Sequence, residues 1–301
     1  MDFKKILGPG MVATAALLWA TDALVRYPAI RSLDPTFIVF FEHILAVLIL
    51  LPWVLYKYPK RLFDLNFTEW LTAIFSGIGG SALATIFFTA SFLYINPSVS
   101  VLLQKLQPIF VVLIAFAVLG ERPKRSFYFW AIIALSAGIV LTFPDLQFRF
   151  LLEDVNLTSR GFHYAFGAAF LWAASTVTGK FLLKRTPVVL ATFWRFFFGL
   201  VGLLAILGVS HNPDLQLITD FHFISKNAFP LFYLSLIPGM FAMMVYYGGL
   251  ARTPASATTF IELIYPIGAI ILNTVFLHTP LETVQTGAGI MLLFAVAMIS
   301  F

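Results

Sequence analysis

The sequence predicts an all-α integral membrane protein with ten transmembrane helices arranged as two inverted five-helix repeats. Of the 301 residues, 60% are hydrophobic and only 11% are charged, whereas soluble domains carry about 25% charged residues. Apolar runs of about 20 residues, the length that a helix needs to cross a bilayer, recur along the chain. The chain has no cysteine, so disulfides and thiol chemistry are excluded.

Ten runs are long and apolar enough to cross the membrane. The predicted spans are residues 8–26, 36–56, 69–92, 98–119, 126–143, 161–183, 188–209, 228–250, 255–277 and 281–300. The first run has no clear small-residue cleavage site and nine more follow it. We therefore expect it to be a retained helix rather than a signal peptide.

The distribution of basic residues predicts the orientation. If the N-terminus is cytoplasmic, twelve of the 19 Lys and Arg residues fall on the cytoplasmic side, five fall on the other side, and Lys105 and Arg195 lie inside spans. This bias places both termini in the cytoplasm. In a membrane protein the net charge of +5 reports orientation rather than nucleic-acid binding. We expect the protein in a bacterial inner membrane.

The chain divides into two related halves. Residues 1–143 form the first half, 144–160 a polar linker, and 161–301 the second half. Ala-Leu-Leu-Trp-Ala around Trp19 recurs as Ala-Phe-Leu-Trp-Ala around Trp172, an offset of 172 − 19 = 153. Five spans is an odd number, so the second half must enter the membrane upside down relative to the first. Inverted repeats of this kind are typical of secondary transporters.

The chain resembles the EamA-type carriers of the drug/metabolite transporter superfamily over essentially all ten spans. The residues that carry the resemblance are Trp19, Trp172, Phe193-Trp194-Arg195-Phe196, the segment from Tyr94 to Pro108, and Leu119-Gly120-Glu121. Two places depart from the pattern. Glu42-His43 stands where Arg-Phe is common, and Leu277-His278-Thr279 stands where Leu-Gly-Glu would recur. The resemblance implies a carrier for amino acids, sugars, amines, nucleotides or drugs.

Four charged residues lie deep inside predicted spans, and such residues are functional candidates. Glu42 and Lys105 share one level, roughly 9–10 Å from one face at about 1.5 Å per residue, while Arg195 and Glu262 share the opposite level. We predict two ion pairs, Glu42–Lys105 and Arg195–Glu262, that flank and help to close a central substrate cavity. The alternative is that these are fixed structural pairs.

Further polar residues extend the candidate site. Asp22 either joins a network with Glu42, His43 and Lys105, or simply pairs with Arg26 four residues later. We consider Asp22, Glu42, His43 and Glu262 candidates for proton coupling, although His43 fits a hydrogen-bonded bundle histidine better. Gln104 is expected to bond across helices and to contact substrate.

Two tryptophans and four prolines are placed by the repeat. Trp19 and Trp172 occupy equivalent mid-span positions, so we expect them to line the cavity and to stack on a ring or a cation; plain packing is the alternative. Two interrupted spans at corresponding places point to a transport site. The prolines of these interruptions are hinge candidates, or else fixed kinks. They are Pro97, Pro108, Pro254 and Pro266.

These observations predict a secondary transporter that moves a small polar or zwitterionic, amino-acid-like metabolite by alternating access, with proton-coupled export as one option. A lipid scramblase or flippase, or an exporter of lipophilic cations, is the alternative. We do not expect an enzyme, because the chain has no clustered catalytic groups. It also has no phosphate-binding G-x-x-x-x-G-K-[ST] motif. We expect no cofactor and no metal. The expected partners are a small-molecule substrate, membrane lipids, protons and at most a second copy of the chain.

Overall fold

The computed structural model describes residues 3–29, 33–91, 94–95, 100, 103–142, 160–210, 220–277 and 283–300, and in these ranges the chain is helical without strands. The helices of the first half are α1 (Phe3–Ala20), α2 (Asp22–Ala29), α3 (Pro35–Lys57), α4 (Phe67–Gly77), η1 (Ile78–Leu83), α5 (Ala84–Ser91), α7 (Gln107–Leu119) and α8 (Arg125–Thr142). Those of the second half are α10 (Arg160–Leu182), α11 (Val188–Ser210), α12 (Phe221–Lys226), α13 (Ala228–Leu234), η3 (Ser235–Phe241), α14 (Ala242–Arg252), α15 (Ala255–Ile261), η4 (Glu262–Ile264), α16 (Tyr265–Leu277) and α17 (Thr283–Ser300).

Seven helical segments of the described chain are long and apolar enough to cross a membrane, and α7 and α8 supply shorter apolar helices. Backbone polar groups find no partner in lipid, so a helix, which satisfies them internally, is the structure these runs adopt. Local sequence sets the ends. Asn66 and Glu69 form a reciprocal capping box at the start of α4, and Gly120 ends α7 with a φ of 70°, a conformation that glycine adopts without strain.

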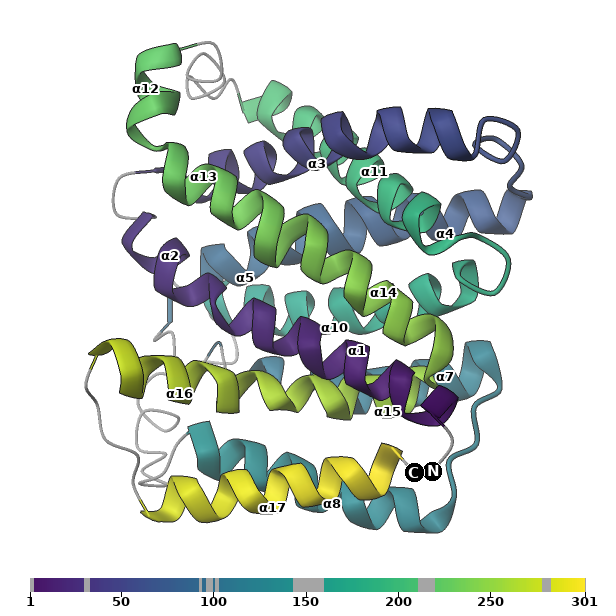
Figure 1. Cartoon of the computed structure of the whole chain (residues 1–301), viewed down its shortest axis with the longest axis vertical. Helices are drawn as coiled ribbons and strands as arrows, with labels where there is room; N and C mark the ends of the chain where they lie inside the picture. The colour runs from purple at the N-terminus through teal and green to yellow at the C-terminus, as the bar shows by residue number, and fades with distance from the viewer. Residues whose placement is uncertain are drawn as a thin grey trace.

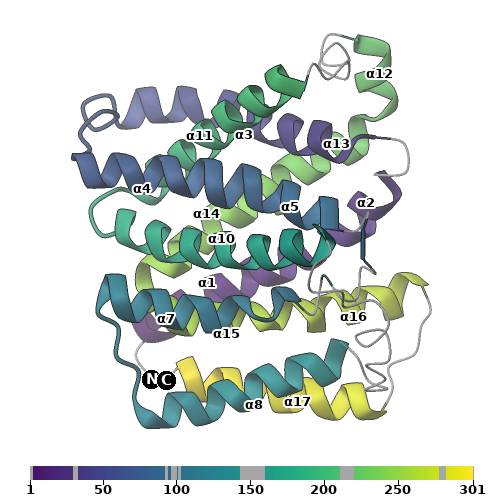
Figure 2. The same cartoon turned by 180° about the vertical axis from the view of Figure 1, so that it is seen from behind.

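The helices lie side by side across the shorter dimension of the molecule (Figure 1). The start of α1 and the end of α17 lie at the same end of the bundle as the α3–α4 and α7–α8 connections, and the reverse view agrees (Figure 2). We call this the terminal end. The structure thus places both termini together, as predicted, while their cytoplasmic assignment stays a prediction.

Helix packing pairs the two halves symmetrically. In the first half α1 packs on α14, and in the second half its counterpart α10 packs on α4 and α5. The helix α3 packs on its counterpart α11, and α8 packs on its counterpart α17. If the two halves are exchanged, each of these helix contacts becomes an equivalent contact of the same group. This pattern supports a two-fold relation between the halves.

The helix irregularities repeat as well. Two π-helical segments, η1 and η3, begin at Ile78 and Ser235, an offset of 235 − 78 = 157. The fourth span breaks in a turn at Lys105, and the ninth breaks at η4, which begins at Glu262, again an offset of 157. Breaks and π-bulges often mark functional sites, and here they lie at corresponding places in the two halves.

The predicted hinge prolines that the structure describes lie at helix starts, and two of these starts follow the breaks. Pro108 is in the first turn of α7, Pro266 is the second residue of α16, and Pro254 is the N-cap of α15. A proline in the first turn loses no intrahelical hydrogen bond. These three prolines therefore belong to helix junctions, and Pro97 lies outside the described residues. Their role as hinges stays a prediction.

Candidate functional site

Arg195 on α11 is the centre of a buried polar cluster. The residue is 7% exposed. Its Nη1 donates to the hydroxyl oxygens of Ser76 (3.0 Å), Ser175 and Tyr247 (3.4 Å), and its Nη2 donates to the carbonyl oxygen of Gly80 (3.1 Å). Its Nε is buried and has no partner among the described residues. Four helical elements, α4–η1, α10, α11 and α14, therefore converge on one guanidinium.

Glu262 lies in the neighbouring part of the same cluster. Tyr246 donates its hydroxyl hydrogen to Glu262 Oε1 at 2.8 Å, and its oxygen lies 3.2 Å from Thr176 Oγ1. Tyr246 directly precedes Tyr247, the partner of Arg195. Among the described residues no ion pair joins Arg195 to Glu262, so the predicted direct pair is wrong. The two adjacent tyrosines bind one charge each instead.

The second predicted pair, Glu42–Lys105, is also wrong. Arg26 Nη2 binds Glu42 Oε1 at 2.5 Å, and the same guanidinium binds both carboxylate oxygens of Asp22 at 2.6 and 2.8 Å. The alternative prediction, that Asp22 pairs with Arg26, is confirmed. The sequence interpretation assigned Arg26 to the end of its span. Arg26 follows Asp22 by four residues, a spacing that places both side chains on one helix face.

Lys105 and Gln104 lie just before α7, at the break in the fourth span. Lys105 is 8% exposed and makes no ion pair with another residue that the structure describes. Gln104 is half-buried. A buried ammonium without an anionic partner is costly, which keeps Lys105 a candidate for an anionic or polar ligand group. The substrate-binding role of both residues stays a prediction.

His43 has both ring nitrogens engaged. Nδ1 lies 2.7 Å from the carbonyl oxygen of Val39, and Nε2 lies 2.8 Å from Ser81 Oγ. Its ring contacts the edge of Phe196, with centroids 5.2 Å apart. Phe196 is the repeat counterpart of His43, at an offset of 196 − 43 = 153. This geometry matches a hydrogen-bonded bundle histidine, where α3 and α11 cross.

The two predicted tryptophans contact equivalent aromatic residues. Trp19 packs on Tyr246 with ring centroids 5.1 Å apart, and its Nε1 donates to the carbonyl oxygen of Pro238 in η3 at 2.9 Å. Trp172 packs on Phe88 with centroids 5.2 Å apart. Tyr246 and Phe88 are themselves related by an offset of 246 − 88 = 158. Both tryptophans are half-buried, and their role in lining a cavity stays a prediction.

Sequence reasoning did not assign a role to Glu121, the last residue of the Leu-Gly-Glu motif. Its carboxylate accepts hydrogen bonds from Ala255 N (2.8 Å), Ser256 N (2.9 Å) and Ser256 Oγ (2.6 Å). A carboxylate there stabilises the positive end of the helix dipole of α15. Lys180 Nζ, close by, caps the C-terminus of α14 by donating to three carbonyl oxygens, those of Leu250, Ala251 and Thr253. The Glu121 contacts tie the two halves together at the terminal end, and the Lys180 contacts join α10 to α14 within the second half.

Neither of two cavities, of about 340 and 180 Å³, is lined by the predicted substrate-binding residues. In the part of the chain that the structure describes, no three His, Asp or Glu side chains gather that could hold a metal ion. The polar features of the site are therefore the Arg195–Glu262 cluster and the Asp22–Arg26–Glu42 group.

A bundle of apolar helices, broken and π-bulged around buried polar clusters, is the architecture of a polytopic membrane protein. The chain belongs to the EamA-like transporter family, whose model matches residues 6–143 and 159–301. The family that the sequence resemblance indicated is thereby confirmed, and the protein is a transporter of the drug/metabolite transporter type.

Several curated proteins are similar to the chain. The riboflavin transporter ImpX of Fusobacterium nucleatum subsp. nucleatum is 29% identical over 99% of this chain and 98% of its own length. An uncharacterised transporter of Archaeoglobus fulgidus is 26% identical over 85% of this chain and 84% of its own. The uncharacterised inner membrane transporter YhbE of Escherichia coli is 25% identical over 60% of this chain and 56% of its own length. These relatives are named as transporters, which points to transport rather than catalysis.

A solved crystal structure shares the fold. Its chain is 18% identical to this one and superposes with a TM-score of 0.75, covering 97% of this chain and 96% of that chain. At this level of identity the likeness concerns the arrangement of the helices.

Proposed function

We propose that the protein is a secondary transporter that moves a small polar metabolite across a bacterial inner membrane by alternating access, and that a flavin such as riboflavin is its substrate. The supporting observation is the Arg195–Glu262 cluster, because it combines hydrogen-bonding groups with aromatic rings and draws on helices of both halves. The riboflavin transporter that aligns over nearly the whole chain supports the same substrate.

The chemistry of riboflavin suits this cluster. Riboflavin has a flat tricyclic ring with carbonyl and ring-nitrogen acceptors, and a chain of hydroxyl groups. Trp19 and Tyr246 offer ring faces, and aromatic rings prefer offset or tilted stacking. The guanidinium of Arg195 has five donors in a rigid fork, and its Nε is unpartnered among the described residues. Carbonyl oxygens of the substrate would satisfy such donors.

Alternating access needs contacts that open at each end in turn. At the terminal end the Glu121 cap joins the connection after α7 to α15. A second such contact joins α2 to α3, because Arg26 on α2 binds Glu42 on α3. We propose that the two halves form an inverted repeat with cytoplasmic termini, and that opening one end leaves the other end closed. In a proton-coupled cycle, Glu42 and Glu262 would carry the proton, because each carboxylate is held by one partner that a conformational change can remove.

Counterflow into proteoliposomes tests the substrate. Vesicles loaded with unlabelled riboflavin should accumulate labelled riboflavin transiently, with and without a pH gradient. Substituting Trp19→Leu should lower the initial rate, whereas Trp130→Phe, on the distant α8–α17 pair, should leave it unchanged. Labelled amino acids form a parallel arm, because Arg195 and Glu262 bring both charge signs into one cluster.

The outcomes separate the proposals. Counterflow of amino acids but not of riboflavin would show that the substrate is a zwitterion and not a flavin. Equilibration of fluorescent phospholipid between leaflets, with no solute counterflow, would show that the protein is a lipid scramblase and not a solute carrier.

A further inference from the structure

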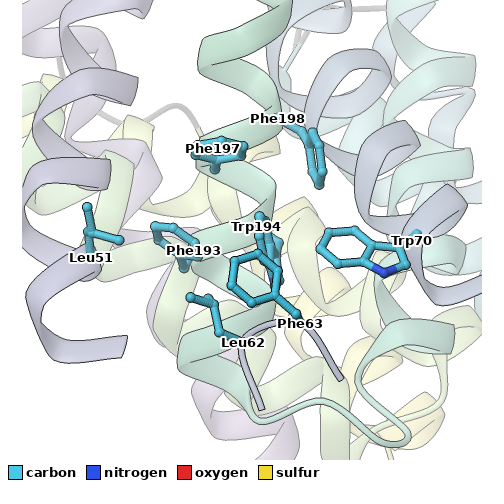
Figure 3. A pocket seen from close by; sticks show the side chains of 8 residues that line it. All are labelled: Leu51, Leu62, Phe63, Trp70, Phe193, Trp194, Phe197 and Phe198. Atoms are coloured by element: carbon cyan, nitrogen blue, oxygen red, sulfur yellow. The ribbon is translucent and has the colours of Figure 1, made fainter. Parts of the chain in front are cut away.

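The cavity of about 340 Å³ named above is apolar, and none of the residues of the polar clusters line it. Its volume is at the lower end of the range of roughly 300–1,000 Å³ for small-molecule sites. It lies between α3, the connection after α3, α4 and α11, and aromatic rings surround it (Figure 3). Its lining residues are Leu51, Leu62, Phe63, Trp70, Phe193, Trp194, Phe197 and Phe198.

The surface of the cavity is apolar. Trp194 is 4% exposed, and its Nε1–H is buried and does not reach the surface of the cavity. An acyl chain, which brings no polar atoms that would need partners, therefore suits this cavity.

The position of the cavity gives access from the lipid. Phe63, which lines it, is 71% exposed, and Tyr56 and Phe67 at the neighbouring helix ends are 88% and 77% exposed. Aromatic residues at helix ends are typical of the membrane–water interface. Trp194 lies six residues after Val188, the start of α11, or roughly 9 Å at about 1.5 Å per residue. This depth lies within the hydrocarbon, because the apolar span Val188–Gly208 begins at the same residue and is about as long as the hydrocarbon core is thick.

Basic residues lie beside the opening of the cavity. Lys57 ends α3, and Lys60 and Arg61 directly precede the lining residues Leu62 and Phe63. All three are exposed, and the structure records no ion pair between them and another described residue. Asp64 is the single acidic residue between Lys57 and Leu65. Basic groups beside a crevice between transmembrane helices attract anionic headgroups.

We propose that this cavity binds one anionic glycerophospholipid. An acyl chain fills the aromatic cavity, and the phosphate group lies beside Lys60 and Arg61. A second copy of the chain fits less well, because a two-fold contact at this surface would bring the same three cations together from both subunits. The proposal is independent of the transported substrate, so its test requires no transport.

Native mass spectrometry of the delipidated protein in detergent tests the site. The protein is titrated with dioleoylphosphatidylglycerol and, in parallel, with dioleoylphosphatidylcholine. The first phosphatidylglycerol should bind about thirtyfold more tightly than phosphatidylcholine, because Lys60 and Arg61 near the headgroup contribute about 1 kcal/mol each.

Lys60→Gln with Arg61→Gln should make the two lipids bind alike, whereas Lys124→Gln with Arg125→Gln, also exposed at the terminal end, should retain the preference. Leu51→Trp fills the cavity and should weaken phosphatidylglycerol binding. This variant is measured on protein that still elutes as a folded species. Equal affinity for the two lipids in the unchanged protein would overturn the proposal. So would a lipid-free dimer that disappears in Leu51→Trp.

Discussion

The Asp22–Arg26–Glu42 group makes a quantitative prediction through a double-mutant cycle. Arg26→Met should be the most costly single change, because it leaves two carboxylates without their cation. One of them, Glu42, has a side chain only 9% exposed. Removing one member of a buried pair costs about 3–5 kcal/mol, and the 26% exposure of Arg26 reduces this to about 3 kcal/mol.

Glu42→Met should cost less, about 0.5 kcal/mol, because Arg26 keeps its two hydrogen bonds to Asp22 and an apolar side chain fills the site. With both changes, only the partly exposed Asp22 lacks a partner, at about 1 kcal/mol. The sum of the single costs therefore exceeds the double cost by about 2.5 kcal/mol, a coupling typical of contacting residues. Lys105→Met combined with Glu42→Met should be additive within about 0.5 kcal/mol.

Thermal unfolding in detergent micelles, followed by the fluorescence of the six tryptophans, measures these differences. At roughly 2–4 °C per kcal/mol for chains somewhat smaller than this one, Arg26→Met should lower the apparent Tm by about 6 °C or more. A coupling between Glu42 and Lys105 larger than that between Glu42 and Arg26 would refute the assignment and restore the pair that sequence depth suggested.

Two further predictions concern helix contacts. Gly80→Ala would place a Cβ 2.0 Å from Ser175 Oγ, so it should displace the Arg195 cluster and destabilise the protein by about 2 kcal/mol or more. Gly287→Ala, with nothing within 4 Å, should be neutral or stabilising in the same melting assay; similar losses in both variants would contradict the close packing. Glu121→Gln removes the charge that caps α15 and should lower stability by about 1 kcal/mol, with Asp64→Asn as the exposed control. An unchanged Tm for Glu121→Gln would show that the cap contributes nothing.

Much of the fold follows from the sequence because the bilayer restricts the choices. Apolar runs of the required length must be helical, and the boundaries found for Thr36–Lys57 and Phe67–Ser91 lie within two residues of the predicted spans 36–56 and 69–92. The π segments, which the sequence did not predict, are related by an offset of 157, close to the 153 read from Trp19 and Trp172. The features that the sequence predicted best are those that depend on length and spacing along one helix.

The contacts of the charged residues were not predictable in the same way. Sequence depth placed Glu42 and Lys105 on one level, but it carries no information about rotation around each helix axis, and Arg26 reaches Glu42 first. Similarly, Arg195 and Glu262 do share a cluster, but neutral hydroxyl groups bind each of them. Tyr246 and Tyr247 escaped notice because two tyrosines in an apolar span also fit packing or interfacial anchoring.

The π segments have a consequence for tolerance to insertions and deletions. A π-bulge holds a residue more than the α-helix that would otherwise occupy the same length, and successive residues of a helix are about 100° apart. Deleting one residue within Ile78–Leu83 would leave a regular α-helix of the same length, so α5 would keep its orientation and Phe88 its contact with Trp172. Deleting one residue between Ala84 and Phe88 instead would rotate Phe88 by about that angle and turn it away from Trp172. The two π segments should therefore tolerate the loss of one residue better than the regular helix beside them.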